Sequence, residues 1–119
     1  MGRTHEFTLV AKEDMADKLG YAVVIGTELI HNTPVAKIAT SAQGIDGIIT
    51  DITGGGANAP VAVARTGDIA FAKIEGSVTV GAELEVGTDG RLKAKASGVA
   101  VAKALATGKE NERIPVLIK

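Results

Sequence analysis

The sequence predicts a small, glycine-punctuated all-β domain, a sandwich or a barrel with at most one short helix, and three observations support this. Short apolar stretches alternate with polar residues, the pattern of strands with one buried face. The 15 glycines fall between these stretches, in the second half at spacings of about 8–12 residues, which is the turn rhythm of sandwiches and barrels. Hydrophobic residues make up 45% of the chain but aromatic residues only 3%, so the core must consist of Val, Ile, Leu and Ala. At 119 residues the chain fits one such domain.

Residues 1–19 are expected to form an amino-terminal arm and a short helical turn. Side chains alternate in character through residues 5–11, which favours an extended segment that serves as an edge strand or an arm. Residues 12–20 favour one or two helical turns, because Met15 and Leu19 are spaced i, i+4 and a glycine follows that can end the helix.

Residues 20–119 are expected to form a single β-domain, which begins with three strands. These strands are predicted at Tyr21–Ile25, Pro34–Thr40 and Ile45–Ile52. The following stretch, Thr53–Pro60, must be a loop. Three consecutive glycines cost too much backbone entropy for a regular element, and its closing proline lacks the N–H that a strand ladder needs.

The second half of the domain continues the strand pattern. Residues 61–71 predict two antiparallel strands around a turn at residues 65–68. The pair Asp89–Gly90 lies between alternating stretches and is the strongest hairpin signal of the chain, because both central positions of such a turn favour positive φ. Further strands are expected within residues 99–105 and 114–118.

Composition and charge exclude several classes of partner. The chain has 13 Lys+Arg against 14 Asp+Glu, and a net charge of −1 does not gather phosphates, so we expect no nucleic-acid binding. The lack of cysteine excludes disulfides, thiolate nucleophiles and zinc–thiolate sites. No stretch reaches the roughly 18 apolar residues of a membrane helix, and the polar start lacks the apolar stretch of a secretory signal. We therefore expect no membrane contact and synthesis in the cytoplasm.

Candidate catalytic and metal-binding residues are few and poorly placed. Neither His5 nor His31 has a catalytic or ligand spacing. Glu83 and Glu85 share a strand face and could in principle bind a cation, but no third ligand follows, so an exposed polar face is the favoured interpretation. The triplet Gly54–Gly56 precedes a strand, without the helix and the Lys and Ser/Thr of a phosphate loop, which favours a surface loop. The sequence therefore predicts a binding protein rather than an enzyme, with no metal and no cofactor.

Six stretches of the chain follow one another in a characteristic order. They are Gly20–Val24, Gly47–Thr50, Ile74–Leu84, Thr88–Leu92, Gly98–Leu105 and Ile114–Ile118. Each stretch alone is common among β-proteins, but their order and spacing together cover most of the chain. In this order the sequence resembles the small capsid decoration (cement) proteins of tailed bacteriophages.

The resemblance implies a structural protein that stabilises a finished icosahedral capsid from outside by bridging neighbouring major capsid subunits. Proteins of this family commonly act as trimers at three-fold and quasi-three-fold positions. The expected partners are therefore the major capsid protein and further copies of the chain in a homotrimer, and the expected location is the outer capsid surface of the virion.

Two segments are the candidate contacts with the capsid or with other subunits. In the first, Phe7, Leu9 and Val10 form an arm that could add a strand to a partner's sheet. The second is the glycine loop, with Thr53, Gly54, Gly55, Gly56 and Asn58 as the contact residues. The alternative function is a small β-barrel that binds a ligand or acts as a co-chaperone-like module through its glycine loop. A stable monomer with a ligand-sized apolar cavity would favour that alternative.

Overall fold

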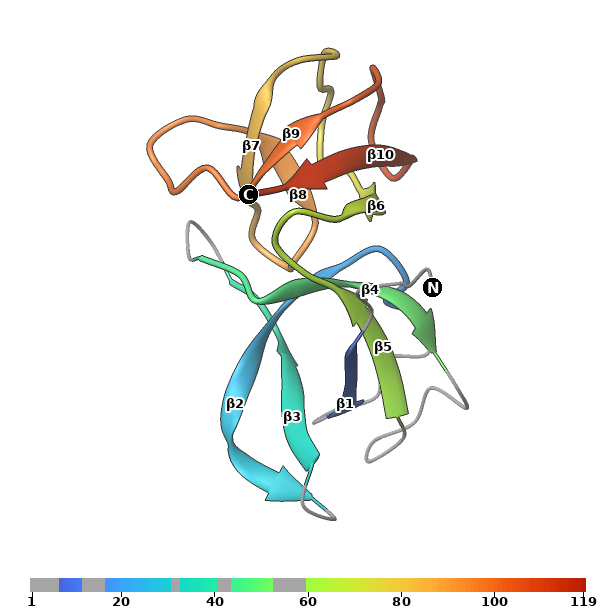
Figure 1. Cartoon of the computed structure of the whole chain (residues 1–119). Coiled ribbons are helices and arrows are strands. Elements are labelled where there is room, and N and C mark those ends of the chain that lie inside the picture. The colour runs from blue at the N-terminus through green and yellow to red at the C-terminus, as the bar shows by residue number, and fades with distance from the viewer. Residues whose placement is uncertain (1–6, 12–16, 31–32, 41–43, 53–59) are drawn as a thin grey trace.

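The computed structural model describes residues 7–11, 17–30, 33–40, 44–52 and 60–119, and these form two β-sheets (Figure 1). Every regular element within this part of the chain is a β-strand, which confirms the predicted all-β fold class. In the view of Figure 1 the first sheet lies below the second, and the chain passes from one to the other between β5 and β6. Within the described residues no helix is long and apolar enough to cross a membrane.

The first sheet is a closed barrel with the strand order β1-β3-β2-β4-β5. Its strands are β1 (Phe7–Ala11), β2 (Ala22–Ile30), β3 (Thr33–Ile38), β4 (Gly47–Ile52) and β5 (Pro60–Ala64). Strand β1 runs parallel to β3 and antiparallel to β5, and this double pairing closes the barrel. The remaining neighbours are antiparallel.

Strand β1 therefore lies in the barrel wall, which corrects the expectation of a projecting arm at residues 7–11. Leu9 is fully buried and Val10 nearly so. An apolar segment gains more by pairing on both sides and leaving water than by projecting from the surface. Of the predicted helical turn, residues 12–16 lie outside the described residues. The part from residue 17 to residue 20 is a turn, in which the Lys18 carbonyl accepts the Tyr21 N–H at 3.0 Å.

The interior of the barrel is filled by apolar side chains, most of them aliphatic residues of its own strands. The buried cluster consists of Leu9, Ala11, Tyr21, Val23, Ala36, Ile49, Val61 and Val63. All five strands contribute to this cluster, and Tyr21 lies directly before β2. In a small barrel the inward-facing side chains of every strand fill the interior in this way. The barrel is thus a packed core.

The second sheet is antiparallel and has the strand order β6-β10-β9-β7-β8. Its strands are β6 (Ile69–Lys73), β7 (Glu83–Val86), β8 (Leu92–Ala94), β9 (Ala102–Ala104) and β10 (Arg113–Ile118). A second buried cluster joins the inner side of this sheet, including Ile74, Leu84 and Val116, to Ala22 and Ile48 of the barrel. The two sheets therefore share this second cluster, which is separate from the cluster inside the barrel.

The second sheet contains the same strand–loop–strand unit twice. The segment from β6 to β7 corresponds to the segment from β9 to β10, 30 residues later in the chain. Ile74 thus corresponds to Ala104, and Gly81 corresponds to Asn111. The Gly81 N–H donates to the Ala104 carbonyl at 2.8 Å, and the Asn111 N–H donates to the Ile74 carbonyl at 2.7 Å. Gly81 and Asn111 both have positive φ, 89° and 66°. Because each unit bonds to the other through equivalent atoms, a local two-fold axis relates them.

The predicted hairpin at Asp89–Gly90 joins β7 to β8, with a wider loop than the two-residue turn that the sequence favours. The Gly87 N–H donates to the Arg91 carbonyl at 2.7 Å, and only Gly90 of the predicted pair has positive φ, 93°. The Gly90 carbonyl accepts the Ala22 N–H at 2.8 Å. The hairpin loop therefore docks on the barrel, which explains its departure from a tight turn.

Candidate interaction surface

The outward side of the second sheet carries two rows of apolar side chains. Phe71 of β6 lies opposite Pro115 of β10, whose carbonyl accepts the Leu105 N–H at 2.9 Å, so these three residues form one row. In the next row Ile69 lies opposite Leu117. Ile69 and Phe71 are 63% and 62% exposed. We call the surface formed by these five residues the outer face.

The local sequence explains why the large side chains of β6 point to solvent. Successive residues of a strand face opposite sides, and in β6 the buried positions are Ala70 and Ala72. Small residues fit there because the barrel approaches closely: the Lys73 N–H donates to the Gly20 carbonyl at 2.9 Å. The solvent side of an antiparallel sheet is ordinarily polar, so adjacent exposed apolar residues on it indicate an interaction surface.

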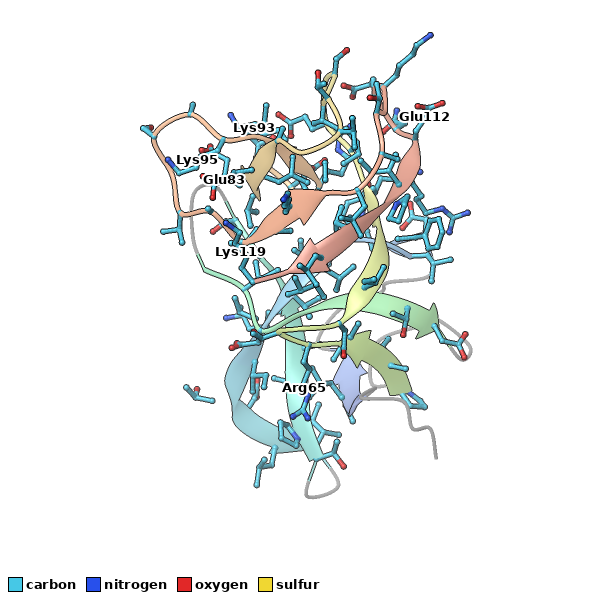
Figure 2. All side chains as sticks on the ribbon, turned by 45° about the horizontal axis from the view of Figure 1, so that its top comes forward. Arg65, Glu83, Lys93, Lys95, Glu112 and Lys119 are labelled. Carbon is cyan, nitrogen blue, oxygen red and sulfur yellow. The ribbon has the colours of Figure 1, made fainter. Side chains whose placement is uncertain are left out.

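Basic residues surround the outer face. At one end Lys73 lies opposite Arg113. At the other end Lys103 lies opposite both Leu117 and Glu83. The basic residues on or beside this side of the sheet are Lys73, Lys93, Lys95, Lys103, Arg113 and Lys119, and several of them gather around Glu83 (Figure 2). Glu83 and Glu85 offset two of these six charges, so the described residues around the outer face leave it net positive although the whole chain carries −1.

Glu83 and Glu85 are held by basic groups and backbone N–H groups. Glu83 pairs with Lys119, whose hydrogen bond and charge lower the pKa of the Glu83 carboxyl. Glu85 is buried, and its Oε1 accepts the N–H groups of Ala96 at 2.7 Å and Gly98 at 2.9 Å. Glu85 thus shapes the loop between β8 and β9 instead of lying on an exposed polar face. In the described part of the chain no three His, Cys, Asp or Glu residues are grouped so that they could hold a metal ion.

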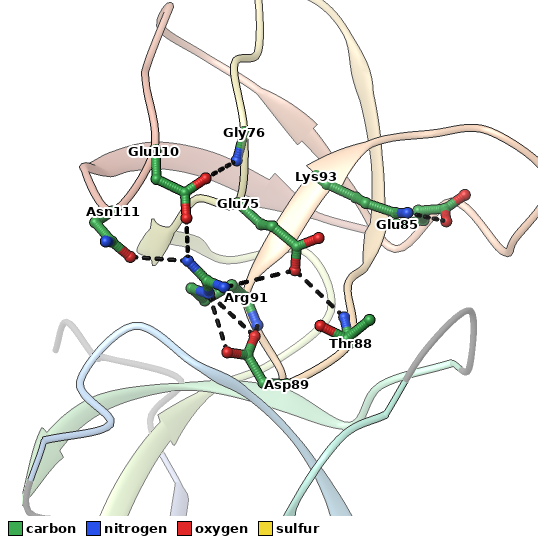
Figure 3. Close-up of polar contacts among 9 residues, drawn as sticks. All are labelled: Glu75, Gly76, Glu85, Thr88, Asp89, Arg91, Lys93, Glu110 and Asn111. Carbon is green, nitrogen blue, oxygen red and sulfur yellow. Dashed lines mark hydrogen bonds and ion pairs between the residues drawn. The ribbon is translucent and has the colours of Figure 1, made fainter.

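Arg91 binds acidic side chains from three loops (Figure 3). Its Nε donates to Asp89 Oδ1 at 3.0 Å, its Nη1 donates to Glu110 Oε2 at 2.6 Å, and its Nη2 lies 3.9 Å from Glu75 Oε1. Nη1 also donates to Asn111 Oδ1 at 2.9 Å. Asp89 and Glu110 in turn raise the pKa of Arg91. This cluster ties the loops after β6, β7 and β9 together and holds the hairpin that docks on the barrel.

We expect the free energy of unfolding to decrease at acidic pH, because the folded chain binds carboxylates in their ionised form. The Gly76 N–H and then Arg91 lower the pKa of Glu110, and the N–H groups of Ala96 and Gly98 lower the pKa of Glu85. Such groups stabilise the fold above their unfolded pKa, near 4.5, and this contribution is lost as the pH falls through the lower, folded pKa.

Thermal melts between about pH 7 and pH 3 test this expectation. The melting temperature should stay level down to about pH 5 and then fall, and Glu110→Gln should fall less steeply because it has one such carboxyl fewer. A melting temperature that rises on acidification would contradict the assignment of these contacts.

The contact residues predicted from the sequence do not coincide with the outer face. Leu9 and Val10 belong to the barrel core, and Phe7 lies at the start of β1. The glycine-loop contacts lie outside the described residues; they are Thr53, Gly54, Gly55, Gly56 and Asn58. Sequence reasoning missed the outer face. The available signal was β6 itself, where Ile69 and Phe71 share one side and two alanines share the other.

Comparison with known proteins identifies a shared fold. No protein-family model matches the chain, and no curated protein does. Among solved structures it is similar to the N base of head fiber gp8.5 of bacteriophage phi29, with a TM-score of 0.73 and 18% sequence identity. The match covers 96% of this chain and 92% of that chain, so it includes both sheets. The chain therefore has the fold of the base of a phage head fiber.

Proposed function

We propose that this chain is a structural protein of a bacteriophage virion that binds the outside of the capsid. The observation that carries the proposal is the fold shared with a phage head-fiber base along 96% of the chain. The resemblance of the motif order to capsid decoration proteins supports the same function independently of the structural comparison. In this role the chain works by adhesion, without catalysis or a cofactor.

In the finer form of the proposal, the chain bridges neighbouring major capsid subunits and acts as a homotrimer. The glycine loop joining β4 to β5 contacts the major capsid protein, with Thr53, Gly54, Gly55, Gly56 and Asn58 as the contact residues. Several copies on one assembly raise avidity by orders of magnitude when all can bind at once. Weak individual contacts are therefore sufficient for firm attachment.

The packed barrel favours this proposal over the alternative of a ligand-binding barrel. Leu9, Tyr21, Val23 and Ile49 are buried in its interior and contact one another as one cluster. A ligand would have to displace this core, at a cost of about 1–3 kcal/mol for each disturbed side chain.

Co-sedimentation with capsids tests the proposed function. Empty capsids assembled from the major capsid protein encoded nearest to this gene should bind the purified chain until the three-fold and quasi-three-fold positions are filled. Removal of Gly54–Gly56 should weaken binding about tenfold or more, whereas Lys109→Ala, in the exposed loop before β10, should not. Capsids that bind none of the wild-type chain would refute the function. Full binding by the deletion variant would refute only the contact assignment.

A further inference from the structure

The outward side of the second sheet combines an apolar centre with a basic border. The centre is the outer face, in which Ile69 and Phe71 of β6 are cross-strand neighbours of two apolar residues of β10. The border consists of the basic residues that surround it. All five strands of the sheet lie within residues 60–119, which the structure describes without a gap. An apolar centre with a polar rim is the usual anatomy of a protein–protein interface.

The acidic residues on this side of the sheet do not neutralise the basic border. Glu83 pairs with Lys119, and Glu85 Oε2 lies 3.8 Å from Lys93 Nζ. Four further basic residues on this side form no ion pair with any residue that the structure describes; they are Lys73, Lys95, Lys103 and Arg113. The border therefore keeps an excess of positive charge that a partner can meet.

The chemistry of a suitable partner follows from the two parts of this surface. Groups that cover Phe71 and Ile69 have to be apolar, and groups that meet the border have to be acidic. A second outer face does not fit, because a symmetric contact places one basic border against another. Nucleic acid does not fit either, since its bases bind by stacking on aromatic side chains and Phe71 is the one aromatic residue of the outer face. The suitable partner is an acidic protein surface with exposed apolar side chains.

The outer face is also preformed for binding. Strands β6 and β10 pair in continuous register from Lys73 and Arg113 to Ile69 and Leu117. Side chains on such paired strands are already positioned before the partner arrives, so little backbone has to become ordered on binding.

We propose that the outer face binds the major capsid protein, at a site on the outside of the capsid where apolar side chains are bordered by Asp and Glu. The proposal rests on the proposed capsid-binding function, which supplies the partner, while the outer face supplies the chemistry of the site. It adds a rigid, charged contact to that of the glycine loop. Because exposed charges are screened by salt, the contact should weaken as the ionic strength rises.

Co-sedimentation with the same empty capsids tests the apolar centre. Phe71→Asp places a carboxylate opposite the acidic surface of the partner and should weaken binding about 30-fold. Leu29→Asp is the matched control, because Leu29 and Phe71 are both 62% exposed and Leu29 lies in β2 of the barrel. In Figure 1 the labelled β2 lies in the barrel at the bottom, away from the second sheet at the top. The control should bind like the wild type, and an equal loss from both variants would overturn the proposal.

Charge reversal tests the basic border. Lys103 lies opposite Leu117 and Glu83, so Lys103→Glu should weaken binding about tenfold at about 50 mM NaCl and by less at about 500 mM. Lys37→Glu, at an exposed position of β3, is the matched control and should bind normally. Equal binding by Lys103→Glu and Lys37→Glu would contradict an acidic site on the capsid.

The remaining outcomes separate this proposal from the proposed function. If capsids bind the wild type and bind Phe71→Asp equally well, only the assignment of the outer face fails. Capsids that bind none of the wild type would refute the proposed function and this proposal with it. Sedimentation velocity without capsids should show the same oligomeric state for Phe71→Asp and the wild type, since a loss of association would make the outer face a contact between copies. Thermal melts check folding, and Ile69→Asp, at a side chain 63% exposed, replaces Phe71→Asp if that variant unfolds.

Discussion

Replacement of Gly47 by Ala should lower the free energy of unfolding by about 3 kcal/mol, because β4 has no room for a side chain there. A Cβ atom on Gly47 would lie 2.6 Å from the backbone oxygen of Ala64 and 3.1 Å from the Cβ of Val63. Gly47 also pairs with Val23 of β2, so β4 is held on both sides and cannot shift away. Urea denaturation monitored by circular dichroism measures the effect.

Gly44→Ala is the matched control for this prediction. Apart from its neighbours in the chain, none of the described residues has an atom within 4 Å of a Cβ at Gly44, so the free energy of unfolding of this variant should change by less than about 0.5 kcal/mol. If Gly47→Ala changes the free energy of unfolding as little as Gly44→Ala does, β4 does not approach β5 as closely as the structure has it.

Replacement of Arg91 by Met should destabilise the chain by about 2 kcal/mol, after allowance for the solvent exposure of its partners. The substitution keeps most of the aliphatic stem but leaves the carboxylates of Asp89, Glu110 and Glu75 without the cation that they share. Burial alone would raise the pKa of Asp89, and the hydrogen bonds from Arg91 outweigh that effect and lower it. Without Arg91 the three loops repel one another.

The pH dependence separates the loss of this charge cluster from a simple loss of packing. Arg91→Met should lose less stability than the wild type when the pH falls from about 7 to 4, because its carboxylates no longer gain from being ionised. Lys109→Met removes a charge from an exposed side chain and should change the urea midpoint little. An unchanged midpoint for Arg91→Met would mean that the cluster does not hold the loops.

Local signals predicted the class of the fold and several of its turns. The loop at Asp89–Gly90 follows from the conformational freedom of glycine, and the alternation of apolar residues in β10 follows from burial of one side of a strand. These features depend on residues close together in the sequence. The composition indicated a core of Val, Ile, Leu and Ala, and both buried clusters consist of these residues apart from Tyr21.

The role of β1 depended on pairing between distant parts of the chain. An extended apolar segment such as Phe7–Ala11 looks the same in sequence whether it projects or completes a barrel. Its pairing of Val10 with Val35 and of Leu9 with Val61 decides between the two, and no local pattern reports those partners. The Arg91 cluster has the same origin, since Glu75 and Glu110 reach it from different loops.

The outer face was missed because alternation does not tell which side of a strand is buried. In β6 the larger side chains, Ile69 and Phe71, would be placed in the core by hydrophobicity alone. The close approach of the barrel admits only Ala70 and Ala72 on that side. The outer face therefore follows from the packing of one sheet on the other.

Electron cryo-microscopy of capsids saturated with this chain tests the proposed function most directly. The reconstruction should show added density on the outer surface, between neighbouring major capsid subunits, into which the two-sheet molecule of 40 × 34 × 21 Å fits. A reconstruction of the saturated capsids that is identical to that of bare capsids would contradict the proposal that this chain binds the outside of a capsid.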